Sequence, residues 1–194
     1  GRGVTAVAAR VLAERTGASL ILLGRRPLPE PERRRHLLAL DEAGVKAEAD
    51  ARLAEMREAP GFTPKAWQAE VDKLRADREL VKNLAALEAL GVGVRYLACD
   101  VGDPEAVARA LREVRDAGAI EGLLHGAGFE AAAPLERKSD ATFTRTVAPK
   151  IDGLDALLAG LEDLTHVVGF GSVSGRFGGH GQADYALANE ALAA

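Results

Sequence analysis

The sequence is poor in the residues and patterns that mark secreted, membrane-bound or metal-binding proteins. Its one cysteine, Cys99, excludes an internal disulfide, and it contains neither a signal-peptide pattern nor an apolar run long enough to span a bilayer. The 4 histidines lie far apart without partners at ligand spacing, so no metal site is expected. A net charge of -4 gives no attraction to nucleic acid or to an anionic membrane. We expect a cytoplasmic protein without metal, nucleic-acid or membrane partners.

Short apolar runs alternate along the chain with segments of helical periodicity, and this alternation predicts an α/β fold with parallel strands. Strands are expected at residues 19–24, 92–101, 120–124 and 166–172, the last one buried and ending at Ser172. Helices are expected at residues 4–16, with Gly17 as the stop, and after Asp103-Pro104. A single apolar stripe from Phe143 to Leu158 predicts one helix that carries Lys150.

Residues 29–89 have no strand pattern and are rich in Ala, Glu, Arg, Lys and Leu. A break near residues 58–62 is followed by Thr63-Pro64, which is typical of an N-cap and a first helical residue. Apolar residues then recur at helical intervals up to Gly91 and predict a long amphipathic helix. We interpret the segment as a helical insertion whose last part connects two strands. It can be a solvated decoration or a docking surface for neighbouring domains.

Three polar residues follow the last predicted strand within one strand–loop–helix stretch. Ser172 ends the strand, Tyr185 lies on an alanine-rich helix that begins near Asp184, and Asn189 follows one helical turn later on the same face. Open α/β sheets bind their ligands at the carboxyl ends of their strands. Each residue alone has an ordinary structural explanation. A serine hydrolase is not supported, because the residues around Ser172 lack the nucleophile-elbow spacing.

Two further features favour a nucleotide. Gly3 precedes the first helix, whose free N–H groups can bind a pyrophosphate. Arg25 and Arg26 end the strand at residues 19–24, where an arginine accommodates the 2′-phosphate of NADP and an acid would bind the ribose of NAD.

The order Lys150, Ser172, Tyr185, Asn189 resembles the short-chain dehydrogenase/reductase superfamily. More narrowly, the chain is similar to the ketoreductase domains of type I polyketide synthases and polyunsaturated-fatty-acid synthases. Five segments fall in the order of that family: residues 1–5, 22–26, 99–101, 125–128 and 181–185. The resemblance implies a Rossmann-like doubly wound parallel sheet over residues 1–194. It also implies that this is a fragment without the first strand, which would end Thr-Gly-Gly before Gly1.

The resemblance also assigns roles to single residues. Tyr185 would be the acid, Lys150 the cation that favours its phenolate, Ser172 a hydrogen-bond donor to the substrate carbonyl, and Asn189 the residue that holds Lys150 or a relay water. Asp100 would bind adenine, and residues 126–128 would lie beside the nicotinamide, with His125 structural. The implied cofactor-binding set is Gly1, Arg2, Gly3, Arg25, Arg26, Asp100, Val101, Gly126, Ala127, Gly128, Lys150 and Tyr185.

The implied reaction is NADPH-dependent reduction of a β-ketoacyl thioester, held on an acyl carrier protein, to the β-hydroxyacyl thioester. Neighbouring synthase domains are the other implied partners. Two alternatives stay open: a free-standing reductase of a small ketone, and a non-catalytic structural subdomain.

Overall fold

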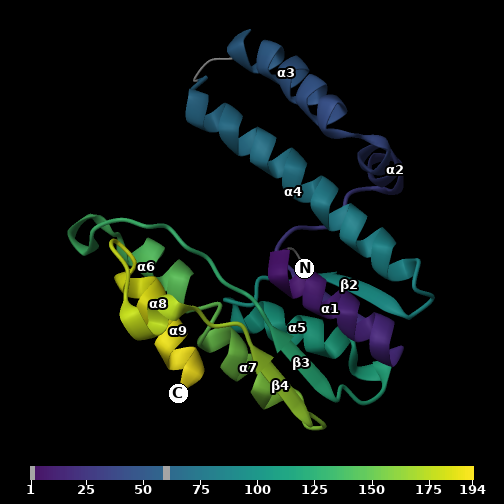
Figure 1. Ribbon diagram of the computed structural model, residues 1–194, viewed down its shortest axis with the longest axis vertical. Coiled ribbons are helices and arrows are strands. Elements are labelled where there is room, and N and C mark those ends of the chain that lie inside the picture. The colour runs from purple at the N-terminus through teal and green to yellow at the C-terminus, as the bar shows by residue number, and fades with distance from the viewer. Residues whose placement is uncertain (1–2, 59–61) are drawn as a thin grey trace.

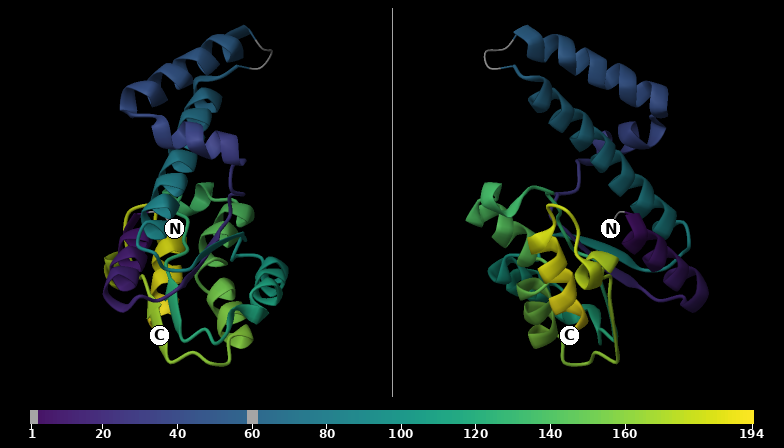
Figure 2. Two further views of the ribbon diagram at one scale, coloured as in Figure 1. Left: turned by 90° about the vertical axis from the view of Figure 1, so that its right-hand side faces the viewer. Right: turned by 60° about the vertical axis from the view of Figure 1, so that its left-hand side comes forward.

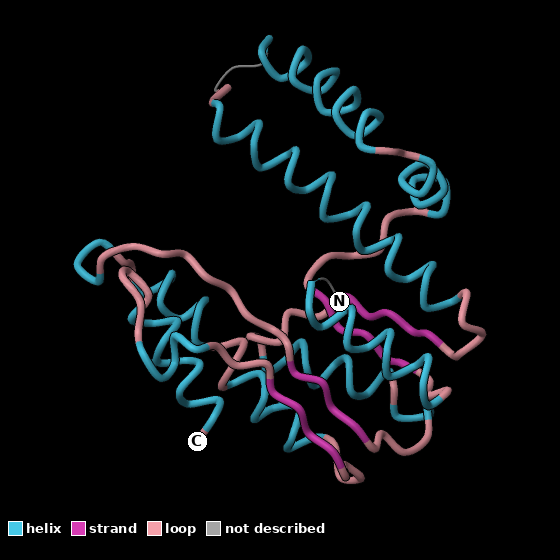
Figure 3. The backbone as a smooth tube through the Cα atoms, in the orientation of Figure 1, coloured by secondary structure: helices cyan, strands magenta, loops and turns pink. Residues whose placement is uncertain are grey.

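The strands of the computed structural model form two parallel pairs, in the part of the chain that the structure describes, residues 3–58 and 62–194. β1 (Leu20–Gly24) pairs with β2 (Val94–Ala98), and β3 (Gly122–His125) pairs with β4 (His166–Gly169). Figure 3 shows the strands of both pairs as magenta segments that lie roughly along one another. The parallel pairing confirms the predicted α/β class, and Gly1 and Arg2 lie outside the described residues.

Helices connect the strands and cover their faces (Figure 1). The α-helices are α1 (Gly3–Thr16), α2 (Pro31–Ala39), α3 (Glu42–Glu58), α4 (Pro64–Glu88), α5 (Pro104–Glu113), α6 (Asp140–Val147), α7 (Asp152–Gly160), α8 (Val173–Phe177) and α9 (Ala183–Ala193). The short 3-10 helices are η1 (Arg115–Ala117) and η2 (Leu135–Arg137). Within residues 3–58 and 62–194, no helix combines the length and the apolar character needed to cross a bilayer.

Local capping signals fix where the predicted helices begin. The Thr63 hydroxyl accepts a hydrogen bond from the Ala66 amide at 3.1 Å, and Asp103 accepts one from the Glu105 amide at 2.9 Å. Each cap is followed by a proline at the first helical position, where its missing N–H costs nothing. Both predicted helix starts are therefore confirmed.

Two separate apolar clusters hold the molecule together. The first joins α2, α3 and α4 through Leu37, Val45, Ala49, Val71, Leu74 and Val81. The second joins the strands to α5 and α7 through Cys99, Val101, Val107, Ala110 and Leu157. Figures 1 and 2 show α2, α3 and the start of α4 projecting away from the strands. The helical character predicted for residues 29–89 is confirmed, and its status as an insertion stays a prediction.

Two predictions about the second half of the chain are wrong in detail. Lys150 does not lie on a helix but in the turn between α6 and α7. Pro149 has no N–H to donate and interrupts the helix there. β4 ends at Gly169 and is not buried, with Val167 48% and Val168 46% exposed. In the described structure it pairs with β3 on one edge only, so neighbouring strands and helices do not enclose it.

Candidate functional site

The predicted site residues follow the carboxyl ends of all four strands. Arg25 follows β1, Asp100 follows β2 after Cys99, and Gly126 follows β3 directly, while Ser172 comes three residues after β4. Because the strands of each pair run parallel, the ends of a pair meet at one edge. Ligand sites of open α/β sheets lie at this edge.

Lys150 is buried at the end of β4, with 4% of the residue exposed. Its Nζ donates to the carbonyl oxygen of Phe170 at 2.9 Å, and the Phe170 amide donates to the His125 carbonyl at 2.9 Å. Burial lowers the pKa of the Lys150 amine below its ordinary value. The buried amine of Lys150 thus contacts Phe170, which lies two residues before Ser172 in sequence.

Ser172 is the N-cap of α8. Its Oγ accepts a hydrogen bond from the Ser174 amide at 3.2 Å. A hydroxyl that accepts here keeps its own proton for donation to another group. Gly175 lets α8 approach α9 closely, because a Cβ there would lie 2.9 Å from the Glu190 amide nitrogen and 3.1 Å from the Asn189 Cβ.

Tyr185 and Asn189 lie on α9, Tyr185 half-buried and Asn189 buried. The Asn189 side-chain Nδ2 donates to the carbonyl oxygen of Tyr185 at 2.7 Å, one turn earlier in the same helix. Its Oδ1 is buried and has no hydrogen-bond partner among the described residues. The structure therefore couples Asn189 to the backbone of Tyr185, and the predicted role of holding Lys150 or a relay water stays a prediction.

The residues predicted to contact the nicotinamide side pack tightly against other predicted site elements. A Cβ on Gly126 would lie 1.9 Å from the hydroxyl of Thr5 in the first turn of α1. A Cβ on Gly128 would lie 3.3 Å from Cε of Lys150. Ala127 packs against the core cluster under the strands. At Gly126 a side chain would clash with Thr5, whereas at Gly128 it would require only a small shift of Lys150. The start of α1 and Lys150 thus both lie close to the turn after β3.

The predicted adenine-side residues have different surroundings. The exposed Asp100 accepts a hydrogen bond from the Gly102 amide at 3.1 Å, whereas Val101 is a core residue with 9% exposure. Arg26 Nε forms an ion pair with Asp77 of α4, with 2.7 Å between Nε and Oδ1. Arg25 is exposed. Of the two arginines, Arg26 is thus held by a partner within the chain.

The start of α1 also contacts α4. The Gly3 amide donates to the Glu79 carboxylate at 3.1 Å. An acceptor with negative charge therefore lies at the N-terminus of α1, the place where such a charge is most favourable.

His125 is a buried residue at the end of β3. Burial lowers its pKa, the charge of Lys150 lowers it further, and a backbone hydrogen bond at Pro149 opposes both. The ring is therefore neutral near pH 7, because its ordinary value of 6.5 is already lower than this pH. The predicted structural role agrees with this burial.

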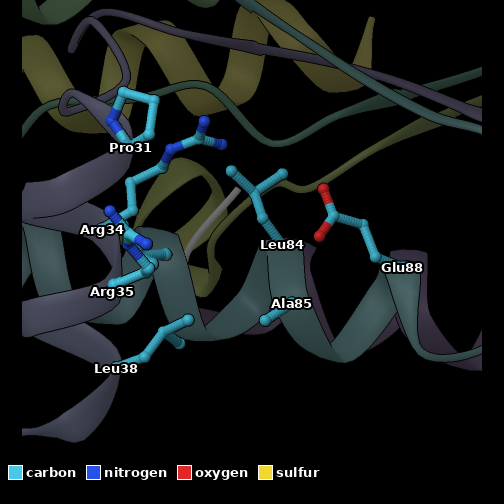
Figure 4. Close-up of a pocket in the computed structure, with 8 residues that line it drawn as sticks. Pro31, Arg34, Arg35, Leu38, Leu84, Ala85 and Glu88 are labelled. Carbon is cyan, nitrogen blue, oxygen red and sulfur yellow. The ribbon is translucent and has the colours of Figure 1, made fainter.

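A groove of about 410 Å³ lies between α2 and α4, away from these residues. Figure 4 shows Arg34, Arg35 and Leu38 of α2 facing Leu84 and Glu88 of α4 across it. Since its walls come only from the segment 29–89 and contain none of the predicted site residues, it is not the candidate active site.

One ion pair beside Tyr185 was not predicted from the sequence. Lys138 and Asp184 form a buried ion pair, 2.5 Å between Nζ and Oδ1, with side chains 2% and 0% exposed. They lie 46 residues apart, and although Asp184 falls in the segment 181–185, no spacing links it to Lys138. The only available signal was an acid directly before Tyr185.

Comparisons with known proteins point to one family. The model of the KR domain family matches residues 68–194. A polyunsaturated fatty acid synthase polypeptide of Thraustochytrium sp. is 34% identical over 98% of this chain. The polyketide synthase PksM of Bacillus subtilis is 37% identical over 57% of it. The chain spans 7% and 3% of the lengths of these relatives.

Solved structures support the same family. A ketoreductase domain from the bacillaene assembly line has a TM-score of 0.64 and 28% identity, and the match covers 95% of this chain and 34% of that chain. An N-terminal ketoreductase from the macrolactin assembly line has a TM-score of 0.66 over 95% of this chain and 29% of that chain, at 24% identity, which supports the fold. These matches confirm the Rossmann-like fold. The chain belongs to the ketoreductase domain family of short-chain dehydrogenase/reductase-type oxidoreductases found in polyketide and polyunsaturated-fatty-acid synthases.

Proposed function

We propose that the chain is the catalytic part of a ketoreductase domain that uses NADPH to reduce a β-ketoacyl thioester, held on an acyl carrier protein, to the β-hydroxyacyl thioester. The observation that carries this proposal is the buried Lys150 at the end of β4. Its hydrogen bond to Phe170 places an amine beside the segment that leads to Ser172. A buried amine whose pKa is lowered is costly to keep unless it serves a function.

The residues present fit a phosphorylated dinucleotide. Gly126 and Gly128 have no side chain, so the turn after β3 lies close to Thr5 at the start of α1 and to Lys150, and the cofactor is proposed to bind beside this turn. Arg25 is the proposed contact of the 2′-phosphate, because Arg26 already pairs with Asp77. Asp100 is the proposed adenine contact. Gly1, Arg2 and Gly3 form the proposed phosphate loop, in which the Gly3 amide would exchange the Glu79 carboxylate for a phosphate oxygen. When bound, NADPH supplies the hydride that reaches the ketone carbon.

The side chains of this chain would handle the proton and the charge on oxygen. Tyr185 donates its phenolic proton to the ketone oxygen, and Lys150 favours the phenolate that remains. Ser172 donates its hydroxyl proton in a hydrogen bond to the same oxygen, since its Oγ already accepts from Ser174. Asn189 holds the helix turn that carries Tyr185 through the carbonyl of that residue. A positioned acid typically contributes about 10²–10⁴-fold, and a donor to developing oxyanion charge about 10²–10³-fold.

The partners follow from the relatives, which are long multidomain synthases by their lengths. The β-ketoacyl group, attached to the carrier protein as a thioester, would reach the edge where the four strands end. The adjoining synthase domains would hold this domain close to that carrier.

The test uses the full polypeptide, NADPH and a β-ketoacyl thioester. Consumption of NADPH with formation of the β-hydroxyacyl product is expected, and NADH should support it less well. Tyr185→Phe should lower kcat by roughly 10²–10⁴-fold while the affinity for NADPH is retained, since the phenol takes part in proton transfer. A Tyr185→Phe protein with native turnover would refute the proposal, and so would a native protein that binds NADPH without reducing the thioester.

A further inference from the structure

The ion pair between Lys138 and Asp184 is buried, although nothing in the proposed reaction uses either charge directly. The two side chains are 2% and 0% exposed, and 2.5 Å separate Nζ from Oδ1. Lys138 follows η2 in the segment between β3 and α6, and Asp184 stands in the first turn of α9. The pair thus joins two segments that are remote in sequence.

Each member of the pair also holds a backbone group. Lys138 Nζ donates to the carbonyl oxygen of Ala131 at 2.8 Å, so it fixes the segment that follows Gly128. Asp184 Oδ1 accepts from the amide of Tyr185 at 2.8 Å. The carboxylate therefore touches the backbone of the proposed acid itself. Lys138 and Asp184 together connect the backbone at Ala131 with the backbone at Tyr185.

Neighbouring contacts tie the same two segments together. The Ala133 amide donates to the carbonyl of Gly181 at 3.0 Å, and Gly181 adopts a φ of 70° that favours glycine. Gln182 donates to Glu130 and accepts from the Ser174 hydroxyl at 3.0 Å. The residues just before Tyr185 are thus held against residues 130–133 on one side and against α8 on the other.

Removing two charges from water is expensive, and apolar residues of similar size often stabilise a fold as well or better. Burial raises the pKa of Asp184, but hydrogen bonds from Lys138, Thr146 and the Tyr185 amide, with the Lys138 charge, outweigh it and lower the pKa. The carboxylate therefore stays ionised at neutral pH. A directional charged contact defines distance and angle more narrowly than apolar packing does.

We infer that Lys138 and Asp184 are positioning residues, which set the place of the Tyr185 backbone, and hence of its phenol, relative to residues 131–138. This inference rests on the proposed function, because it gives the pair a role in the same proton transfer. Of Lys138, Asp184 and Tyr185, only Tyr185 would contact the substrate, and the pair acts through it.

The test compares four variants of the full polypeptide with the native protein: Asp184→Asn, Lys138→Arg, the neutral double variant Lys138→Met with Asp184→Asn, and Val107→Ala. The double variant leaves no unpaired buried charge, so its stability should approach that of the native protein. Val107 is a core residue 1% exposed in the other half of the domain, and Val107→Ala serves as the destabilised control. For each variant kcat, KM for NADPH, KM for the thioester and thermal stability are measured.

The inference expects Asp184→Asn and the double variant to lose roughly 10–100-fold in kcat at unchanged KM for NADPH, because a misplaced acid reacts more slowly. Lys138→Arg should retain part of the native kcat, since it keeps the positive charge. Val107→Ala should lose stability without losing kcat. A double variant that is as stable and as active as the native protein would overturn the inference.

Amide hydrogen exchange separates this outcome from a failure of the proposed function. In Asp184→Asn, exchange should rise in residues 131–138 and 183–187 and stay native around β1 and β2. This readout needs no turnover, so it tests the pair even if the native protein reduces no thioester. Native exchange in both segments would show that Lys138 and Asp184 do not hold Tyr185, whatever the activity.

Discussion

Ser172→Ala is the sharpest perturbation of the proposed site, because the structure offers a matched control. Ser172 caps α8 by accepting from the Ser174 amide at 3.2 Å, and Ser139 caps α6 by accepting from the Thr142 amide at 3.2 Å. Replacing either serine by alanine removes the same kind of hydrogen bond, at a cost of about 0.5–2 kcal/mol in stability. Ser139 also hydrogen-bonds the Thr142 hydroxyl at 3.0 Å, so Ser139→Ala should be destabilised at least as much as Ser172→Ala.

Their effects on turnover should differ strongly. If the Ser172 hydroxyl donates to the ketone oxygen, its removal costs about 2.7–4 kcal/mol of transition-state stabilisation, or roughly 10²–10³-fold in kcat. Ser139→Ala removes no such donor and should keep native kcat. Both rates are measured as NADPH consumption with a saturating β-ketoacyl thioester. Equal kcat values for the two variants would refute the assignment of Ser172, since the loss of a helix cap, which both variants share, would then account for the whole change in kcat.

Two more predictions concern the helical segment and the cofactor. A hydrogen bond from Arg33, helped by His36 and by the charge of Arg52, lowers the pKa of Glu48 to about 2 against the effect of burial. Glu48→Gln should cost about 1–2 kcal/mol at neutral pH, and this difference should vanish as the pH falls from 4.5 toward 2, checked by exchange of α2 and α3 amides during an acid titration. Arg25→Ala should raise KM for NADPH by roughly 10–100-fold and leave KM for NADH unchanged, and equal effects on both cofactors would contradict the 2′-phosphate contact.

Features encoded by neighbouring residues were predictable from the sequence. The starts of α4 and α5 follow from Thr63-Pro64 and Asp103-Pro104, because an N-cap and a first-turn proline act within one helical turn. The end of α1 at Gly17 follows from the freedom of glycine at a φ of 69°. These signals are local and depend little on the rest of the fold.

Features that depend on distant residues were not predictable. The apolar stripe continues from Phe143 to Leu158 across Pro149, so periodicity alone joined α6 and α7 into one helix. The exposure of β4 depends on which strands and helices lie beside it, which its apolar sequence does not contain. The contact of Lys138 with Asp184 spans 46 residues and has no sequence signal of its own.

The placement of α4 has a mechanical consequence. Asp77 holds Arg26 after β1, and Glu79 holds the Gly3 amide at the start of α1. Residues two positions apart on an α-helix point in nearly opposite directions. The contacts of Asp77 and Glu79 therefore hold α4 on two sides, and it cannot rotate about its axis without breaking one of them. Substitutions at Asp77 or Glu79 are therefore expected to loosen α4 from the domain. Changes at exposed positions of the outer tip, formed by α3 and the first turns of α4, should leave the stretch from Asp77 to Glu79 in place as long as the apolar cluster that joins α2, α3 and α4 is kept.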